Sequence, residues 1–320
     1  MLWEFATSMI PSENSRADRV PALGSPQRSE YDGPTLSVIV PHYNDLANLR
    51  RCVELLCVQT EPRDNFEIVI ADNNSSCGFD AVVAACGERA RVVPAPVQGA
   101  GPARNEGAKH AIGRYLAFID SDCRPDREWV ARGISALDGE DMVGGHVEVV
   151  VDDPKNPTAT EAFERVFAFN NRKYVENRGF SITGNMFVRK DVFEAVGDFR
   201  AKVAEDVDWG RRAVALGYRW YYASDVRICH PARRDWSELT RKWRRLIEES
   251  IYAAREKRFG LLFWLGRSWL VALSTLIAWP TILLSPRLDR FEHKVAAIEV
   301  LFRLRGWRFI ESHLALFKYR

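Results

Sequence analysis

Short apolar runs alternate with helix-like patterns along the first third of the chain. The runs at 36–40 and 66–72 are rich in Val and Ile, which is typical of buried parallel strands. Residues 45–58 between them carry apolar side chains at helical spacing. The alternation continues with a helix, a strand, a helix and a strand, expected at 79–86, 91–95, 102–113 and 115–120. This order predicts βαβ units and a parallel sheet.

The middle of the chain is less regular. Alternation at 141–152 predicts strands that extend the sheet as a mixed one, and residues 158–174 have helical spacing. An acidic turn and a helix are expected within 201–217, where Gly217 supplies a stop signal. Two short strands are expected after it, at 218–224 and 226–230.

The pattern divides the chain into three parts. Residues 1–34 are polar and rich in Ser, Pro and Arg, which predicts a flexible leader. We expect an α/β domain over 35–235 and a helical region over 236–320. Within that last region, residues 236–258 predict a basic amphipathic helix, and residues 291–318 predict another amphipathic helix.

An apolar stretch separates these two helices. Residues 268–285 hold no charged side chain over 18 positions, which reaches the lower limit for a membrane span. Both flanks are basic, with eight Lys and Arg in 241–267 and eight more in 286–320, and the positive-inside rule disfavours placing either flank outside. Because Pro280 can bend the stretch, we expect an in-plane or re-entrant attachment to an anionic membrane from the cytoplasmic side. A soluble amphipathic helix packed on the α/β domain is the alternative.

Composition narrows the classes of protein. The net charge of +2 argues against a nucleic-acid binder, which usually carries a strong basic excess. The six cysteines are scattered without a C-x-x-C pair, which favours free thiols in a reducing cytosol. The first residues lack a basic segment followed by a long apolar run, so we expect no signal peptide.

Two aspartates end the strand-like run that begins at Tyr115. Asp120 and Asp122 stand one position apart, so both carboxylates can face one ligand. Open α/β sheets bind ligands just outside the carboxyl ends of their strands. A carboxylate pair there suits a hard divalent cation, which prefers oxygen ligands. Taken alone, the pair is also compatible with capping or loop residues beside a turn.

Five motifs occur in one order along the chain. They are Pro41-His42-Tyr43-Asn44, Asp72-Asn73-Asn74-Ser75, the Gly-rich segment 99–107, Asp120-Ser121-Asp122 and Glu205-Asp206-Val207-Asp208-Trp209. With these motifs the chain resembles the family 2 glycosyltransferases of the GT-A fold, over about 36–235. The resemblance implies a Rossmann-like mixed sheet flanked by helices, a sugar transfer that inverts the anomeric centre, and a place in cell-surface polysaccharide biosynthesis.

The resemblance implies that the first two motifs hold the nucleoside. Tyr43 would stack on the base, and Asp72 would accept hydrogen bonds from a uracil N–H or a ribose hydroxyl. Pro41 and Asn44 would shape the turn beside them. From the residues alone, a surface or core aromatic at Tyr43 and an Asx-turn at Asp72 stay open as alternatives.

The Gly-rich segment opens the helix expected at 102–113. Gly101 permits unusual backbone angles, and a helix N-terminus favours an anion. Arg104 lies in an Ala-Arg-Asn pattern that matches the family, and it would present its donors to the diphosphate or to Asp120. A plain helix cap with a surface arginine is the alternative.

The resemblance also implies a metal site. Asp120 and Asp122 would contact the ribose and a Mg²⁺ or Mn²⁺ ion on the diphosphate, with Asp122 touching the metal directly. His230 stands where several GT-A enzymes place a further metal ligand, although a structural role stays open. Such an ion would neutralise charge on the departing nucleoside diphosphate.

A one-step inversion requires a carboxylate base near the acceptor hydroxyl. The resemblance makes Asp206 that base, and Glu205 the residue that orients it or the acceptor. Stabilisation of a helix N-terminus is the alternative role for both carboxylates. Gly184 and Asn185 lie where the family lines the donor-sugar and acceptor pocket, and Trp209 either stacks on a sugar ring or packs in the core.

The expected activity is therefore that of a hexosyltransferase. The donor would be a nucleotide-diphospho-sugar, with a UDP-sugar preferred, and the acceptor a hydroxyl of a saccharide or a polyprenyl-linked sugar. A nucleotidyltransferase of related fold would need a Gly-rich phosphate loop after the first strand, where this chain has PHYNDLANL at 41–49. A non-catalytic membrane scaffold would not need the acidic positions, all of which are filled here.

Overall fold

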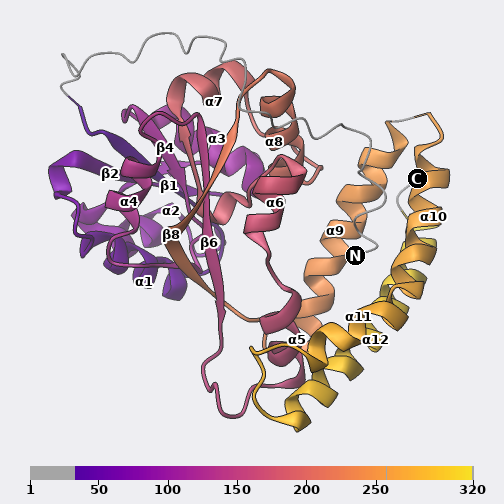
Figure 1. The fold of residues 1–320 in the computed structure, drawn as a ribbon. Helices are drawn as coiled ribbons and strands as arrows, with labels where there is room; N and C mark the ends of the chain where they lie inside the picture. The colour runs from indigo at the N-terminus through magenta and orange to yellow at the C-terminus, as the bar shows by residue number, and fades with distance from the viewer. Residues whose placement is uncertain (1–32, 257, 319–320) are drawn as a thin grey trace.

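The computed structural model describes residues 33–256 and 258–318. Nearly all of the leader expected at 1–34 therefore lies outside the described residues. The centre of the molecule is an eight-stranded mixed sheet with helices on both faces (Figure 1). The strands are β1 (Leu36–His42), β2 (Phe66–Asp72), β3 (Arg91–Pro94), β4 (Tyr115–Phe118), β5 (Arg124–Pro125), β6 (Met142–Val150), β7 (Met186–Arg189) and β8 (Trp220–Pro231).

One half of the sheet is parallel, as the alternating pattern predicts. Strands β3, β2, β1 and β4 lie side by side in that order and run in the same direction. Their Val- and Ile-rich sequences suit strands that are covered on both faces. Because the carboxyl ends of these strands meet at one edge of the sheet, the segments that follow β1, β2 and β4 gather there.

Helices cover both faces of the sheet. Neighbouring residues of β1 point to opposite sides, so Val38 packs with Leu49 on one face while Ile39 packs with Ala108 on the other. Helices α1, α2 and α4 line the first face, and α3, α7 and α8 line the second. The helices before residue 236 are α1 (Leu46–Cys57), α2 (Phe79–Cys86), α3 (Ala100–His110), α4 (Trp129–Ala136), α5 (Ala159–Phe167), α6 (Asn171–Arg178), α7 (Lys190–Val196) and α8 (Glu205–Ala215).

The other half of the sheet contains antiparallel pairs. Strand β7 runs antiparallel to β4 and β6, while β8 runs parallel to β6 and antiparallel to β5. The two strands expected at 218–224 and 226–230 are the single strand β8 instead. Pairing with β6 is interrupted between Ala223 and Arg227 and then resumes, so the break in the sequence pattern is an irregularity within one strand.

The helix expected at 158–174 is divided in two. Helix α5 ends at Phe167, and the Asn170 side chain then accepts a hydrogen bond of 3.2 Å from the backbone N–H of Lys173. That contact is the N-cap geometry that begins a new helix, α6. Gly179 ends α6 in a left-handed conformation, with φ of 68°.

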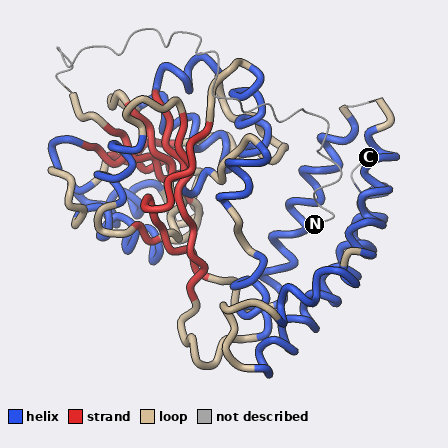
Figure 2. The backbone as a smooth tube through the Cα atoms, in the orientation of Figure 1, coloured by secondary structure: helices blue, strands red, loops and turns tan. Residues whose placement is uncertain are grey.

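The helices after residue 235 form a C-terminal arm beside the α/β domain (Figure 2). The arm consists of α9 (Trp236–Arg255), α10 (Gly260–Leu273), α11 (Thr275–Leu283) and α12 (Phe291–Lys318). Asp235 caps α9 by accepting a 2.9 Å hydrogen bond from the backbone N–H of Glu238. Apolar side chains of α9, α11 and α12 pack against Ala162 and Phe163 of α5, which joins the arm to the domain.

The apolar stretch at 268–285 does not form one helix. It is shared between α10 and α11, whose axes bend by 44° at Ser274. The bend therefore lies before Pro280, which sits inside α11, and not at the proline as expected. In the described part of the chain no single helix meets the length and hydropathy of a bilayer span, and α10 with α11 meets them only as a bent pair.

Candidate functional site

The predicted site residues gather at the edge of the sheet where β1, β2 and β4 end. Register places His42 at the end of β1 beside Asp72 at the end of β2. Tyr43 follows β1 directly, and its ring is 54% exposed, so it is free to stack on a flat ligand. Pro41 belongs to β1 and pairs with Ala71.

Asp72 and His42 present buried polar atoms that lack partners among the described residues. The Asp72 carboxylate is only 3% exposed, and its Oδ2 accepts a long 3.4 Å hydrogen bond from the backbone N–H of Ser75. Its Oδ1 and both ring nitrogens of His42 have no hydrogen-bond partner in the described structure. Because unpaired buried polar atoms are rare and costly, this corner is suited to a ligand that carries N–H or O–H groups.

Asn44 holds the two loops at this corner together. It takes a left-handed backbone conformation, with φ of 56°, which Asn tolerates better than most residues. Its side-chain oxygen accepts hydrogen bonds from the backbone N–H and the hydroxyl of Ser76, at 2.7 and 2.9 Å. The expected turn-shaping role of Asn44 is therefore visible as a direct link between the segments after β1 and β2.

Arg104 joins two parts of the site that are distant in sequence. Its Nη2 lies 2.5 Å from Oδ1 of Asp120, and its Nη1 lies 2.8 Å from Oε1 of Glu205. The Arg104 side chain is almost fully buried, at 4% exposed, whereas the Asp120 and Glu205 side chains are 35% and 21% exposed. Helix α3, which carries Arg104, begins at Ala100, two residues before the expected start.

Gly184 makes room for a carboxylate of the site. A Cβ at Gly184 would lie 2.9 Å from Oδ2 of Asp120, which is closer than real Cβ atoms come to a neighbour. At Gly101, a Cβ would be tight only against Cβ of Phe199, at 3.3 Å, and would meet Cβ of Glu205 at an ordinary contact distance of 3.5 Å.

Asp120 and Asp206 have pKa values shifted in opposite directions. Burial alone would raise the pKa of Asp120, but the adjacent Arg104 outweighs burial and holds that pKa below its usual value. Burial raises the pKa of Asp206 to about 7, and the neighbouring Glu205 adds to the rise. The site thus combines a carboxylate whose pKa is lowered by Arg104 with one whose pKa lies near neutral pH, a property that suits a general base.

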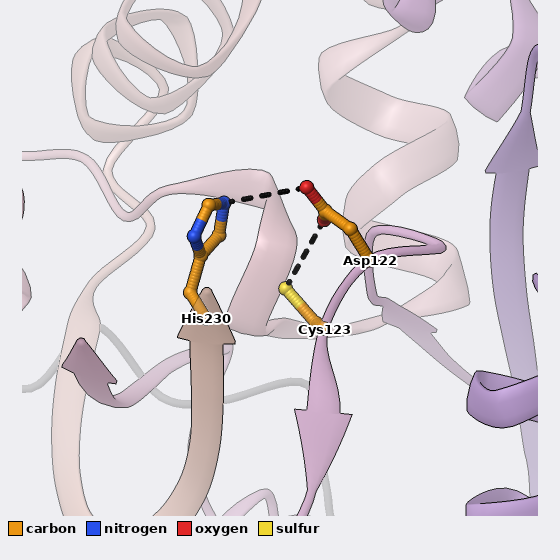
Figure 3. A group of neighbouring side chains, drawn as sticks. All are labelled: Asp122, Cys123 and His230. Atoms are coloured by element: carbon orange, nitrogen blue, oxygen red, sulfur yellow. Dashed lines mark hydrogen bonds and ion pairs between the residues drawn. The ribbon is translucent and has the colours of Figure 1, made fainter. Parts of the chain in front are cut away.

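Asp122 faces His230 across the end of the sheet (Figure 3). Oδ2 of Asp122 lies 3.7 Å from Nε2 of His230. Cys123 completes a group of three, since one ligand atom of each residue lies within 4.8 Å of the other two. Oxygen, nitrogen and sulfur donors at this spacing can converge on a metal ion.

Two predicted pocket residues belong to the interior. The Trp209 ring is completely buried against Phe193 and Phe199, and its Nε1 donates to the carbonyl of Gly197. It therefore packs in the core and does not stack on a sugar, because the face of α8 that carries it turns toward the sheet. Asn185 is also completely buried.

The Asn185 side chain uses its polar atoms inside the protein. Its Nδ2 donates to the carbonyls of His146 and Val226, and its Oδ1 accepts from Nε1 of Trp129. Asn185 thus fixes the backbone around Gly184 instead of lining a pocket.

Helix α9 brings residues to the site that the sequence motifs did not indicate. Burial raises the pKa of Glu249 to about 7, with Arg245 opposing the rise and Glu205 and Asp206 adding to it. Arg245 in turn helps to lower the pKa of Asp120. Both side chains are therefore close enough to Asp120, Glu205 or Asp206 to interact with their charge. The sequence signal for Arg245 and Glu249 was their spacing of four residues, which places both on one face of an amphipathic helix.

The sequence profile of the family described as glycosyl transferase family 2 matches residues 37–197. Glycosyltransferase AglE of Haloferax volcanii is 36% identical over 217 residues, which is 65% of this chain and 70% of that protein. The poly(ribitol-phosphate) beta-glucosyltransferase of Bacillus spizizenii is 30% identical over 92 residues, which is 27% of this chain but only 14% of that protein.

Two solved structures share the fold. The mannosyltransferase PcManGT of Pyrobaculum calidifontis, in complex with GDP-Man and Mn²⁺, has a TM-score of 0.56 at 17% identity, covering 88% of this chain and 86% of that one. S. aureus TarS 1-349, in complex with UDP-GlcNAc, has a TM-score of 0.51 at 19% identity, covering 86% of this chain and 73% of that one.

Proposed function

The chain belongs to glycosyl transferase family 2 and is a glycosyltransferase, and on that premise we propose that it transfers a sugar from a nucleotide-diphospho-sugar with inversion. The preferred donor is a UDP-sugar, and the acceptor is a hydroxyl of a saccharide or a lipid-linked saccharide. The observation that carries the proposal is the pair of ion pairs at Arg104, which ties the Asp120 carboxylate to Glu205 beside Asp206.

Different residues of the chain bind the nucleoside, remove the proton and hold the reacting groups in position. The unpaired Oδ1 of Asp72 accepts a hydrogen bond from the base or ribose, and the exposed ring of Tyr43 covers the base. Asp206, with a pKa of about 7, takes the proton of the acceptor hydroxyl as that oxygen attacks the anomeric carbon. Arg104 holds the donor side and the base side at a fixed separation, which keeps the nucleophile in line with the leaving diphosphate.

A divalent cation fits the residues around Asp122. The Asp122 carboxylate faces Nε2 of the buried His230 imidazole. Because an oxygen lone pair and a nitrogen lone pair repel each other, their close approach is favourable when a cation lies between them. Asp122 and His230 would hold the ion, with Asp120 beside them. When bound, Mg²⁺ or Mn²⁺ would offset the negative charge of the departing nucleoside diphosphate.

The C-terminal arm supports a lipid-linked acceptor and a place at the cytoplasmic face of the plasma membrane. The arm exposes many large apolar side chains, and the surface of a soluble monomeric protein rarely carries so many together. The exposed members are Phe259, Leu262, Phe263, Trp269, Leu270, Leu273, Leu276, Ile277, Trp279, Leu284, Phe291, Val295, Phe302, Ile310, Leu314 and Phe317.

Charge and shape favour an anionic bilayer as the partner of this apolar surface. The arm is rich in Arg and Lys, which bind anionic headgroups, and its tightly bent pair α10–α11 suits attachment in the plane of the interface or re-entry. Since Arg245 and Glu249 of α9 interact electrostatically with Asp120 and Asp206, an arm bound to lipid would keep the base near the membrane surface.

The experiment is a screen of nucleotide sugars with Mn²⁺ or Mg²⁺ and a membrane lipid extract as the acceptor source. Release of nucleoside diphosphate is measured for the full chain, for Asp122→Ala and for Asp138→Ala, an exposed carboxylate outside the site. We expect Asp122→Ala to lower the rate at least about 10²-fold and Asp138→Ala to leave it unchanged. Release of pyrophosphate, or equal rates for all three proteins, would refute the proposal.

A further inference from the structure

Cys123 immediately precedes strand β5, and His230 follows Cys229 on β8. Strand β5 pairs antiparallel with β8, with Arg124 opposite Cys229, so continuing this register by one residue brings Cys123 beside His230. Side chains at opposed positions of an antiparallel pair point to the same face and have Cβ atoms about 5 Å apart. The pairing of a two-residue strand therefore sets a thiol and an imidazole side by side next to Asp122.

The three side chains point toward one another (Figure 3). Sγ of Cys123 lies 3.8 Å from Oδ1 of Asp122, and Nε2 of His230 lies 3.7 Å from Oδ2 of the same carboxylate. Cys123 is 1% exposed and His230 is 7% exposed. The thiol is therefore buried next to the Asp122 carboxylate, where water does not compete with it for a ligand.

A backbone contact fixes which nitrogen of His230 faces the group. Its Nδ1 lies 2.7 Å from the carbonyl oxygen of Pro231, and a carbonyl can only accept a hydrogen bond. Nδ1 of the neutral ring therefore carries the proton, which leaves the lone pair on Nε2 directed at Asp122. This is the arrangement that orients metal-binding histidines in general, and the Phe169 ring, with its centroid 4.9 Å from that of the imidazole, braces it further.

We propose that Cys123 is a third ligand of the metal site, so that the site can hold, besides Mg²⁺ or Mn²⁺, a thiophilic divalent cation, Zn²⁺ or Co²⁺, through sulfur, nitrogen and oxygen. This rests on the proposed function only in that a cation occupies the position between Asp122 and His230. Three protein donors leave a fourth position open for a diphosphate oxygen. On binding, the thiol gives its proton to the solvent, and the thiolate forms the bond to the metal.

A hard ion and a soft ion would use this group differently. Mg²⁺ prefers oxygen donors and would contact Asp122 without the sulfur, whereas a thiolate strongly favours Zn²⁺. If Cys123 only fills space in the core, as buried cysteines often do, the metal would show oxygen and nitrogen neighbours alone. The two situations differ in the atoms around the ion.

X-ray absorption at the zinc edge tests this on the unmodified full chain loaded with one equivalent of Zn²⁺. We expect a sulfur neighbour at about 2.3 Å together with lighter neighbours at about 2.0 Å. A shell of oxygen and nitrogen only would overturn the proposal. Because no substitution is involved, the result does not depend on how a variant folds.

A matched pair of variants then identifies the sulfur. Full-length Cys123→Ser is compared with Cys229→Ser, which removes the thiol next to His230 on β8. We expect Co²⁺ to give a sulfur-to-metal charge-transfer band in the near ultraviolet with the unmodified chain and with Cys229→Ser, and no band with Cys123→Ser. The dissociation constant for Zn²⁺ should rise at least about tenfold in Cys123→Ser, while that for Mg²⁺ changes little.

The outcomes separate this inference from the proposed function. A band that persists in Cys123→Ser overturns the assignment of the sulfur. Binding of UDP with Mn²⁺ is measured in parallel by calorimetry. If UDP binds with Mn²⁺ but no sulfur contact is found with Zn²⁺ or Co²⁺, the third ligand is refuted and the transferase proposal stands. If no nucleoside diphosphate binds with any metal, the transferase proposal fails, whatever the sulfur does.

Discussion

Arg104 is the residue at which the two halves of the site meet. A guanidinium has donors in a fixed planar fork, so one buried side chain can bind Asp120 and Glu205 at once without flexing. A lysine would offer a single point charge. The distance between Asp120 and Glu205 is therefore set by the geometry of one functional group.

Replacing that fork tests how strongly the rate depends on this distance. In Arg104→Lys the charge is kept but one of the two ion pairs is lost, and we expect kcat to fall about 10²-fold because the reacting groups are displaced. Arg132→Lys, which alters an exposed pair with Glu128 on α4, is the control and should transfer sugar at the normal rate. Steady-state kinetics measure kcat for the two variants, and an unchanged kcat in Arg104→Lys would contradict the positioning role of Arg104.

Asp206 gives a prediction with two readouts. Asp206→Asn removes the base, so we expect transfer to fall by about 10²–10⁴-fold while nucleotide and metal binding persist. In the unmodified protein the rate should rise as the pH passes through about 7, the pKa to which burial raises this carboxyl. Equal rates for the two proteins would show that the base is another residue.

The same substitution should stabilise the fold. Because the pKa of Asp206 is raised by folding, the native state holds a proton that the unfolded chain has released, and stability is lost as the pH rises from about 4 to about 7. Asn carries no such charge, so Asp206→Asn should melt at a higher temperature than the unmodified chain at pH 8, with a smaller difference at pH 5. Thermal unfolding at the two pH values measures this, and a larger difference at pH 5 would contradict it.

Sequence reasoning named carboxylates that lie near one another in the structure but could not assign every neighbour. It expected Arg104 to present its donors to the diphosphate or to Asp120, and the structure contains the ion pair with Asp120. Trp209 was ambiguous, because a tryptophan after two acidic residues does not reveal which face of the helix is buried. Cys123 was missed because its place near His230 depends on the pairing of the two-residue strand that follows it, which no periodicity can indicate.

At the scale of elements, the join between α5 and α9 holds the arm to the domain. Glu164 of α5 is 2% exposed and lies 3.0 Å from Nη1 of Arg233 and 3.4 Å from Nζ of Lys242. Burial lowers the pKa of Lys242 to about 8, although Glu164 opposes that shift. Lys242 also lies over the ring of Phe169, with its Nζ 5.1 Å from the ring centroid. The join is therefore ionic as well as apolar.

Breaking this join should cost more than breaking a surface pair. Glu164→Gln leaves Arg233 and Lys242 without their buried counter-charge, and we expect a loss of about 3 kcal/mol in the free energy of unfolding. Glu176→Gln, which removes an exposed partner of Arg172, should cost at most about 0.5 kcal/mol. Urea titration compares the two variants, and equal midpoints would mean that the ionic join adds no stability.

The elements themselves were predictable where a single local pattern decides them. β1 and β2 were recognised from their Val and Ile runs, and α2 from its helical spacing. Where tertiary contacts decide, the pattern misled. In the sequence, Asn170 looks like one more polar position of a helix, but in the structure its side chain caps α6. Strand β8 continues past Asp225 because its pairing with β6 resumes at Arg227.

At the scale of the whole molecule, the apolar surface of the arm predicts binding to lipid. We expect the full chain to sediment with vesicles containing phosphatidylglycerol and less with pure phosphatidylcholine, because basic residues of the arm add an electrostatic attraction. Changing Leu262 and Phe263 of α10 to Glu should reduce the bound fraction several-fold. Val58→Glu, an exposed apolar residue of the α/β domain, is the control. Equal binding by both variants would refute this surface as the docking face.

The division of the site between two stretches of chain has a consequence for how such a protein can diversify. In the proposed function, the nucleoside is bound by the ends of β1 and β2, whereas Glu205, Asp206 and Glu249 come from α8 and α9. If that division holds, mutations in the later stretch would redirect the enzyme to a new acceptor while its donor recognition is inherited unchanged. Arg104 cannot vary in this way, because its substitution would break the ion pair with Asp120 and the ion pair with Glu205 at once.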